Sequence, residues 1–175
     1  YRPQPYNASL KWEETETINA GLDFALFNNV LTGAIDVYQK NTSDLLAKVP
    51  NPAFFGFSNY DNYNVGKIRN KGVELSSEIK IIRNDKLNWS VGGNLTVQES
   101  KITGLIPGSS SVGLQAGDAI DGGVDNHVQI NQVGYTPNSF YVYEQIYNSN
   151  GKPIDGAFVD RNGDGKVNSE DLYIY

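Results

Sequence analysis

The stretch Thr15-Glu16-Thr17-Ile18-Asn19-Ala20-Gly21-Leu22-Asp23-Phe24-Ala25-Leu26-Phe27 decides the fold class. Apolar residues occupy every second position from Ile18 to Leu26. This alternation predicts a β-strand, because a helix of this length would scatter the same positions around its surface. Asn28-Asn29 follows directly, and asparagine tolerates the positive φ of a tight hairpin turn. The segment therefore predicts a strand that ends in a hairpin.

The same alternation recurs over residues 30–40, 72–82 and 87–101 and predicts further strands there. Residues 139–147 are also predicted to form a strand, with aromatic residues on both of its faces. Residues 83–86 form a short turn between two of them. The alternation is absent from residues 41–70 and 102–138, which we expect to be long loops, the second with short strands such as residues 127–133. The fold class is all-β, built from antiparallel hairpins, and residues 1–175 are expected to form a single fragment.

The expected strands have about ten or more residues, against about 5–6 for most strands of globular proteins. A tilted strand that crosses a bilayer needs about 9–11 residues. Strand length therefore favours a slice of a large transmembrane β-barrel with long outer loops. A half-solvated soluble sheet has the same two-faced pattern. Trp12, Phe27 and Trp89 lie near strand ends, as in membrane-interface girdles, although core aromatics also flank strands.

Composition excludes several functions. The 14 Lys and Arg against 20 Asp and Glu give a net charge of −6, with no basic cluster for nucleic acid. Cysteine is absent and His127 is the only histidine, so thiolate chemistry and multi-histidine metal sites are excluded. Methionine is absent too, so we expect the chain to be a piece of a longer protein. No apolar run is long enough for a transmembrane helix.

Residues 160–171 fit the spacing of a calcium-binding loop. Gly165 stands at the position that needs a sharp turn. The ligand positions are filled by Asp160, Asn162, Asp164, Lys166 (through its carbonyl), Asn168 and Asp171. The same side chains could instead cap backbone amides in a metal-free Asx-turn loop. Because the flanks lack helical periodicity, the expected role is a structural Ca²⁺ staple.

Other polar residues give weaker signals. Scattered carboxylates provide no reason to select a catalytic pair, and we expect them to be solvated or to face a lumen. His127 is expected to be a loop histidine satisfied by water. No catalytic residue is predicted, and the substrate-binding residues cannot be identified from the sequence.

Several segments resemble the SusC/RagA-like family, TonB-dependent outer-membrane receptors of Bacteroidetes. The resemblance is carried by residues 7–13, 19–24, 26–33, 36–46, 70–75 and 139–143, and by the loop 160–171. It covers most of the chain in the same order and is weakest over residues 102–131.

The resemblance implies a location in the cell outer membrane and a plugged barrel of about 22 strands, of which this chain is a slice. It also implies import of a nutrient, an oligosaccharide (glycan) or a peptide, with a SusD-like surface lipoprotein and TonB as partners and outer-membrane lipid around the wall. The family is not enzymatic.

Two alternatives stay open at this point. One is a secreted β-sandwich stabilised by calcium, of the carbohydrate-binding or adhesin kind, which would need shorter strands. The other is a calcium-dependent glycan hydrolase, which would need a defined carboxylate pair.

Overall fold

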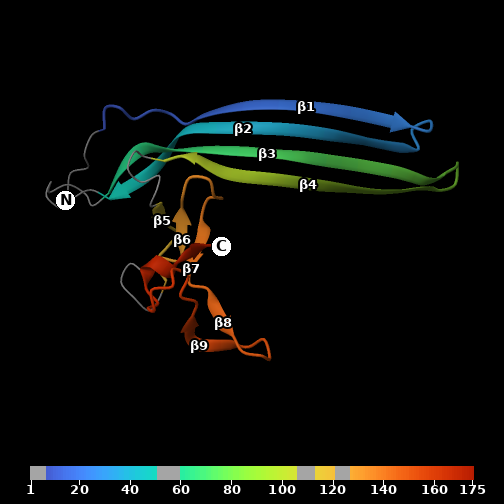
Figure 1. The fold of residues 1–175 in the computed structure, drawn as a ribbon. Helices are drawn as coiled ribbons and strands as arrows, with labels where there is room; N and C mark the ends of the chain where they lie inside the picture. The colour runs from blue at the N-terminus through green and yellow to red at the C-terminus, as the bar shows by residue number, and fades with distance from the viewer. Residues whose placement is uncertain (1–6, 51–59, 106–112, 121–126) are drawn as a thin grey trace. The chain divides into compact units, whose positions relative to one another are not determined.

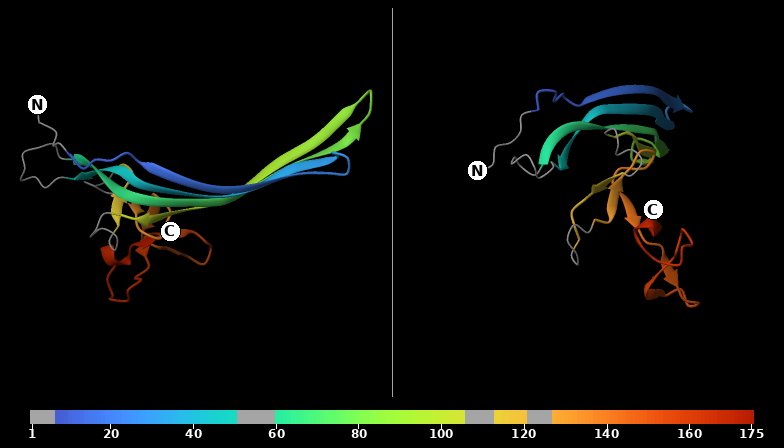
Figure 2. Two further views of the ribbon diagram at one scale, coloured as in Figure 1. Left: turned by 90° about the horizontal axis from the view of Figure 1, so that it is seen from above. Right: turned by 60° about the vertical axis from the view of Figure 1, so that its left-hand side comes forward.

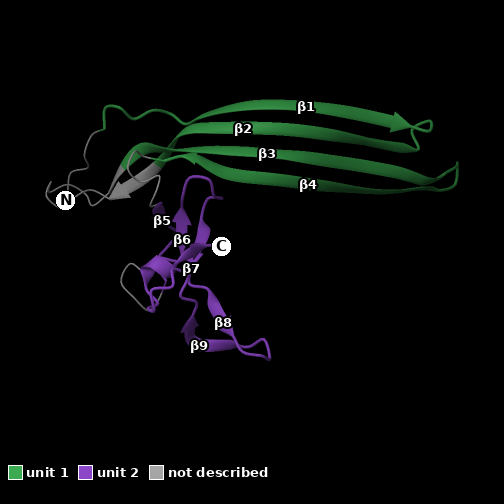
Figure 3. Cartoon of the chain, in the orientation of Figure 1, with its two compact units in different colours: residues 1–106 green, residues 107–175 purple. Residues whose placement is uncertain are grey.

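The computed structural model describes residues 7–50, 60–105, 113–120 and 127–175. The chain divides into two compact units, residues 1–106 and 107–175 (Figure 3). Both units are built from antiparallel β-strands, so the expected all-β class is confirmed. A search of the described residues finds no helix with the length and apolarity to cross a membrane.

Unit 1 holds a single four-stranded antiparallel sheet in the order β1-β2-β3-β4 (Figure 1). The strands are β1 (Glu14–Leu26), β2 (Leu31–Pro50), β3 (Tyr60–Arg83) and β4 (Asn88–Gly104). They have 13, 20, 24 and 17 residues, more than a strand needs to cross a bilayer. The sheet bends and twists along its length (Figure 2), as right-handed strand twist requires.

Both expected tight turns are present in unit 1. Phe27, Asn28 and Asn29 have φ values of 55°, 54° and 63°, and the Val30 amide donates to the Phe27 carbonyl at 3.2 Å. In the second turn Asn84 Oδ1 accepts the amides two and three residues further on, at 3.0 and 2.8 Å. The asparagines therefore fix the two hairpins locally.

The loop expected over residues 41–70 is shorter than the sequence indicates, because β2 continues to Pro50 and β3 begins at Tyr60. The pairing of β2 with β3 shifts register between Thr42 and Leu45, where Asp44 has φ 55°. An irregularity of this kind breaks the period of two, so alternation could no longer reveal the strand. The aromatic run of residues 54–57 lies outside the described residues.

Unit 2 contains short strands in two sheets, of order β10-β7-β6-β5 and β8-β9. The elements are β5 (Leu114–Ala116), β6 (Gln129–Asn131), β7 (Ser139–Val142), β8 (Gln145–Tyr147), β9 (Pro153–Phe158), the 3₁₀ turn η2 (Ser169–Asp171) and β10 (Tyr173–Ile174). Among the described residues of this unit, Ile130 and Ala116 are buried apolar residues, which makes its core small.

Two expectations for this part of the chain need correction. The strand expected over residues 139–147 is divided, because β7 pairs with β6 and β10 whereas β8 pairs with β9. The partner changes at Tyr143 and Glu144, and the Tyr143 ring lies 5.3 Å from that of Phe158. The loop expected over 102–138 contains the end of β4 and the strand β5, in addition to β6, which lies within the short strand expected at residues 127–133. That residues 1–175 form one barrel piece stays a prediction.

Candidate functional site

One face of the β1–β4 sheet carries an apolar band. In its central row Leu22, Ile35, Leu75 and Leu95 are direct neighbours across the four strands. The flanking rows on this face add Val37, Val73, Val97, Leu26, Leu31, Ile79 and Val91. Leu22 and Leu95 are 64% and 61% exposed, so nothing in the described chain covers the centre of the band. An apolar surface of this extent needs an apolar environment or a partner.

Large aromatic side chains lie exposed at both ends of the strands. Phe27 and Trp89 stand at the end with the short turns, and Trp12 precedes β1 at the opposite end. Amphipathic rings above and below an apolar band are typical of the two interfaces of a membrane barrel. The three aromatic positions therefore support a wall that faces lipid.

The opposite face of the same sheet is polar and acidic. Asp36 and Glu74 are direct cross-strand partners, and on the same face Asp23 lies one row and Glu78 two rows further along. Within the described residues none of these carboxylates forms an ion pair. Like charges directly opposite one another repel, so this face requires water or a polar partner. A barrel wall has this arrangement when the acidic face lines the lumen.

A loop of unit 2 contains the residues expected to bind calcium. Asp160 accepts the amides of Gly163 at 2.7 Å and Asp164 at 3.2 Å through Oδ1, and that of Gly165 at 2.7 Å through Oδ2. Asn162 Oδ1 accepts the Asp164 amide at 3.0 Å. These bonds wind residues 160–165 around the carboxylate of Asp160. Gly165 has φ 84°, as the sharp turn requires.

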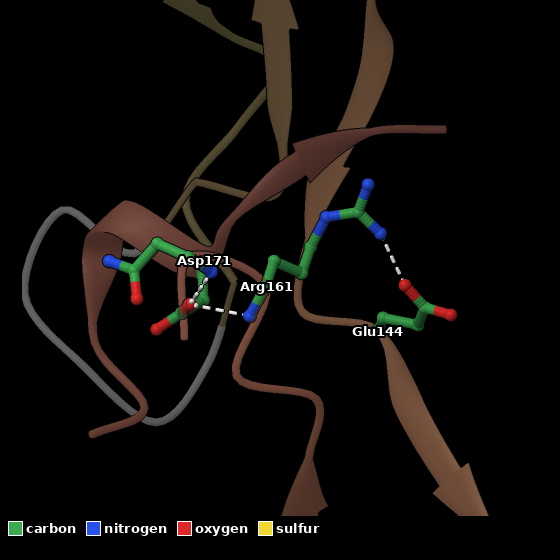
Figure 4. A network of polar contacts seen from close by, with 4 residues as sticks. Glu144, Arg161 and Asp171 are labelled. Carbon is green, nitrogen blue, oxygen red and sulfur yellow. Dashed lines mark hydrogen bonds and ion pairs between the residues drawn. The ribbon is translucent and has the colours of Figure 1, made fainter. Parts of the chain in front are cut away.

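Asp171 closes the loop from its other end. Its Oδ1 accepts the amide of Arg161 at 2.8 Å (Figure 4). Oδ1 also accepts the Asn162 amide at 3.3 Å, and Oδ2 accepts the Asn168 amide at 2.9 Å. The side chain is fully buried. The hydrogen bond from the Asn168 amide, with those from Asn162 and Arg161, lowers the pKa of Asp171 against the opposing effect of burial. The carboxylate therefore stays ionised inside the loop.

Arg161 connects this loop to the strands of unit 2. Its guanidinium forms an ion pair with Glu144, between β7 and β8 (Figure 4). The same group lies 4.5 Å from the ring centroid of Tyr173 in β10. Planar stacking of arginine on an aromatic ring fixes the side chain as well as its charge. The loop, the β7–β8 junction and β10 are thus joined through one residue.

The calcium prediction for residues 160–171 stays a prediction. Among the described residues no group of three or more His, Cys, Asp or Glu side chains is arranged to hold a metal ion. The amide contacts of Asp160 and Asp171 are those that the metal-free Asx-turn alternative expects. The oxygens of Asp160, Asn162 and Asp164 nevertheless keep lone pairs for a cation, because a carboxylate or amide oxygen accepts more than one bond.

Two further features of this site differ in how far the sequence indicates them. The acceptor role of Asp171 is indicated by the spacing of Asn168 and Asp171, which form a capping box around η2. The Arg161–Glu144 ion pair is not indicated, since the two residues are separated by 17 positions. Nδ1 of His127 is buried without a hydrogen-bond partner in the described part of the chain.

A sheet with one lipid-facing and one lumen-facing side defines a segment of an outer-membrane β-barrel wall. The family model for the TonB dependent receptor-like β-barrel matches residues 1–169. The chain is 45% identical over 175 residues to the TonB-dependent receptor SusC of Bacteroides thetaiotaomicron, covering 99% of this chain and 17% of SusC. It is 32% identical over 163 residues to the TonB-dependent receptor P39 of Formosa agariphila, covering 93% of this chain and 15% of that protein.

Solved structures agree with these sequence relatives. The RagAB peptide transporter matches with a TM-score of 0.66 and 33% identity, over 81% of this chain and 14% of that one. The RagAB peptide importer in its open-open state matches with a TM-score of 0.64 and 28% identity, over 90% of this chain and 18% of that one.

The chain belongs to the TonB-dependent receptor β-barrel family and is an outer-membrane protein segment, as the resemblance implied. It spans about a sixth of the length of the relatives it matches. The secreted β-sandwich alternative finds no support, since the long strands of unit 1 form one open sheet.

Proposed function

We propose that this chain forms part of the wall and the outer loops of a nutrient importer of the outer membrane. The nutrient is an oligosaccharide or a peptide, and the partners are a SusD-like surface lipoprotein and TonB. The β1–β4 sheet carries this proposal, because strands of 13 to 24 residues with an apolar and an acidic face suit a barrel wall. The match to the RagAB peptide transporter supports the peptide class, and the match to SusC supports the wider family.

The short turns at residues 27–30 and 84–87 support a periplasmic position for that end of the sheet, because outer-membrane barrels have short periplasmic turns and long outer loops. In this proposal the opposite end of the β1–β4 sheet belongs to the outer side, where a nutrient or a lipoprotein is met. In this proposal the chain supplies no catalytic group, and transport is a property of the whole receptor.

Deletion of the gene for the complete receptor tests the proposal. The deletion strain is grown with oligosaccharides or with peptides as the limiting nutrient and is complemented with the intact gene. Growth is expected to fail on one of the two nutrient classes and to return on complementation. Equal growth of deleted and complemented strains on both classes would contradict the importer role.

An affinity tag on the receptor tests the lipoprotein partner. A SusD-like lipoprotein is expected to co-purify with the tagged receptor from membranes in mild detergent. The control is an unrelated tagged outer-membrane barrel, and recovery of the lipoprotein with both baits would contradict the partnership.

A further inference from the structure

A cationic cluster lies on the lipid-facing side of unit 1, directly beyond the apolar band. It occupies the outermost rows of the β3–β4 pairing, and its members are Lys67, Arg69, Lys71 and Lys101. They share a face with Val73 and Val97, because residues two apart in a strand point the same way. Within two rows of the valine pair, the side chains on this face therefore change from apolar to positively charged.

Two members of the cluster form ion pairs within the chain, and the other two form none with the described residues. Glu99 accepts Lys71 at 2.7 Å and also pairs with Lys101. Lys67 and Arg69 are exposed, and among the described residues no carboxylate lies within ion-pair distance of either. Charge remains available at Lys67 and Arg69 for an anion from outside the chain.

Two depressions adjoin these cations. Toward the outer end of the strands lies a groove of about 580 Å³ whose lining residues are mostly of polar types, among them Lys67, Arg69, Asn41 and Ser43. Below them is a shallow apolar depression of about 280 Å³ between Val37, Val73 and Val97, with Lys71 and Glu99 also in its lining. An amphipathic molecule with a polar anionic head and hydrocarbon chains fits this order.

The distribution of charge in the groove indicates where the anionic part of such a molecule would bind. On β1 the groove carries Glu14 and Glu16, which repel an anion, whereas the cations stand on β3 and β4. Asn41 and Ser43 offer neutral polar groups between the two sides, of the kind that hydrogen-bond to hydroxyls. Phosphate is therefore favoured over β3, and a hydroxyl-rich head group over β2.

We propose that this surface binds the phosphorylated headgroup of an outer-leaflet glycolipid, with a phosphate at Lys67 and Arg69 and an acyl chain across Val73 and Val97. The inference rests on the outer-membrane location of the wall and is independent of the nutrient. Cations at a membrane surface attract anionic headgroups, and arginine binds phosphate through paired N–H groups. The ligand is the lipid and not free phosphate, because the apolar depression continues the cationic rows.

Native mass spectrometry of the complete receptor, delipidated in dodecyl maltoside and titrated with monophosphoryl lipid A, tests the site. The double variant Lys67→Glu/Arg69→Glu is expected to lower the affinity by about tenfold or more. The matched control is Lys40→Glu/Lys80→Glu, which makes the same change of charge on the opposite face and is expected to retain the affinity. Equal losses in the two variants, or a loss in neither, would overturn the proposal.

Two further measurements keep the test decisive. Arg69→Gln, which adds no negative charge, is expected to weaken lipid A binding by about fivefold if the double variant fails to fold. Val73→Thr/Val97→Thr should also weaken binding of the lipid. If this valine variant binds as the wild type does and inorganic phosphate displaces all the lipid, the site is one for a free anion and the lipid proposal is wrong.

Discussion

The ring of Tyr38 lies over Gly72, its direct cross-strand partner, and the Tyr38 hydroxyl donates to Gln98 Oε1 on the next strand at 3.3 Å. A Cβ atom at Gly72 would come within 2.8 Å of the Tyr38 hydroxyl and 2.9 Å of the Val97 carbonyl oxygen. The aromatic ring thus fills the space that the glycine leaves on the polar face, and it links β2, β3 and β4 in one row.

Replacement of Gly72 by valine is expected to destabilise the wall, because the added side chain must displace Tyr38 or separate the strands. Overpacking of this kind costs about 1–3 kcal/mol. Thermal unfolding of the complete receptor, followed by loss of its heat-modifiable gel band, measures the effect. Gly93→Ala on β4 is the control, since no atom lies within 4 Å of a Cβ there. Equal midpoints for the two variants would show that the Tyr38 contact is not required.

Leu95→Arg is expected to destabilise the receptor strongly, because Leu95 lies in the central row of the apolar band. An arginine at the bilayer midplane of a barrel costs about 2–4 kcal/mol. Urea unfolding in lipid vesicles gives the difference from wild type. Thr96→Arg places the same charge on the acidic face one residue away and should cost much less. A similar loss in both variants would argue against the assignment of the two faces.

Loss of the Asp171 carboxylate is expected to destabilise the loop of residues 160–171 and to remove part of its pH dependence. The pKa of Asp171 in the folded chain is lowered, so its contribution is complete above the ordinary aspartate pKa of about 3.9. The contribution falls as the pH drops below that value and is lost as the pH passes through the lowered pKa. Amide hydrogen exchange at Arg161 and Asn168, compared between wild type and Asp171→Asn at neutral and acidic pH, measures it.

Asp155→Asn is the control for this experiment, as Asp155 lies outside the loop on β9. It should leave the pH dependence of exchange in the loop unchanged. If Asp171→Asn also leaves that dependence unchanged, the carboxylate does not hold the loop.

Calcium is expected to raise the melting temperature of the complete receptor, and Asp164→Ala is expected to abolish the increase. The reason is that Asp160, Asn162 and Asp164 offer hard oxygen ligands within a single turn of chain. Scanning calorimetry with Ca²⁺ and with chelator measures the shift. Asp155→Ala should retain the increase, and identical curves for wild type in Ca²⁺ and in chelator would discard the metal.

The strands of unit 1 could be predicted where their faces differ in polarity. From Ile18 to Leu26 every second residue is apolar, and β1 lies where the pattern placed it. Beyond Asn41 the two faces of the sheet no longer differ in polarity, and the irregularity at Asp44 moves the following side chains to the other face. The alternation of residues therefore could not reveal that the strand continues. The division of residues 139–147 depends on the partners β6, β9 and β10, which a single segment cannot reveal.

The loop of residues 160–171 was predictable because its spacing is local. The positions of Asp160, Asn162, Asp164 and Gly165 are set by one another within a few residues. The role of Asp171 as a buried acceptor was open to inference from its capping spacing, but the attachment through Arg161 was not. That attachment depends on how β7, β8 and β10 meet, which is a tertiary property.

The four-stranded sheet ends in β1 on one side and β4 on the other, and the described residues of unit 1 form no further strand beyond either. No single solvent stabilises a segment of this kind. Exposure of the leucine rows to water is unfavourable, and so is exposure of the carboxylates to hydrocarbon. The outer edges of β1 and β4 also present backbone N–H and C=O groups that need a further strand to pair with. The amino-acid sequence of this segment therefore specifies its local strand arrangement, but the segment is stable only as part of the closed barrel. Each portion of the wall depends on its neighbours in the same way.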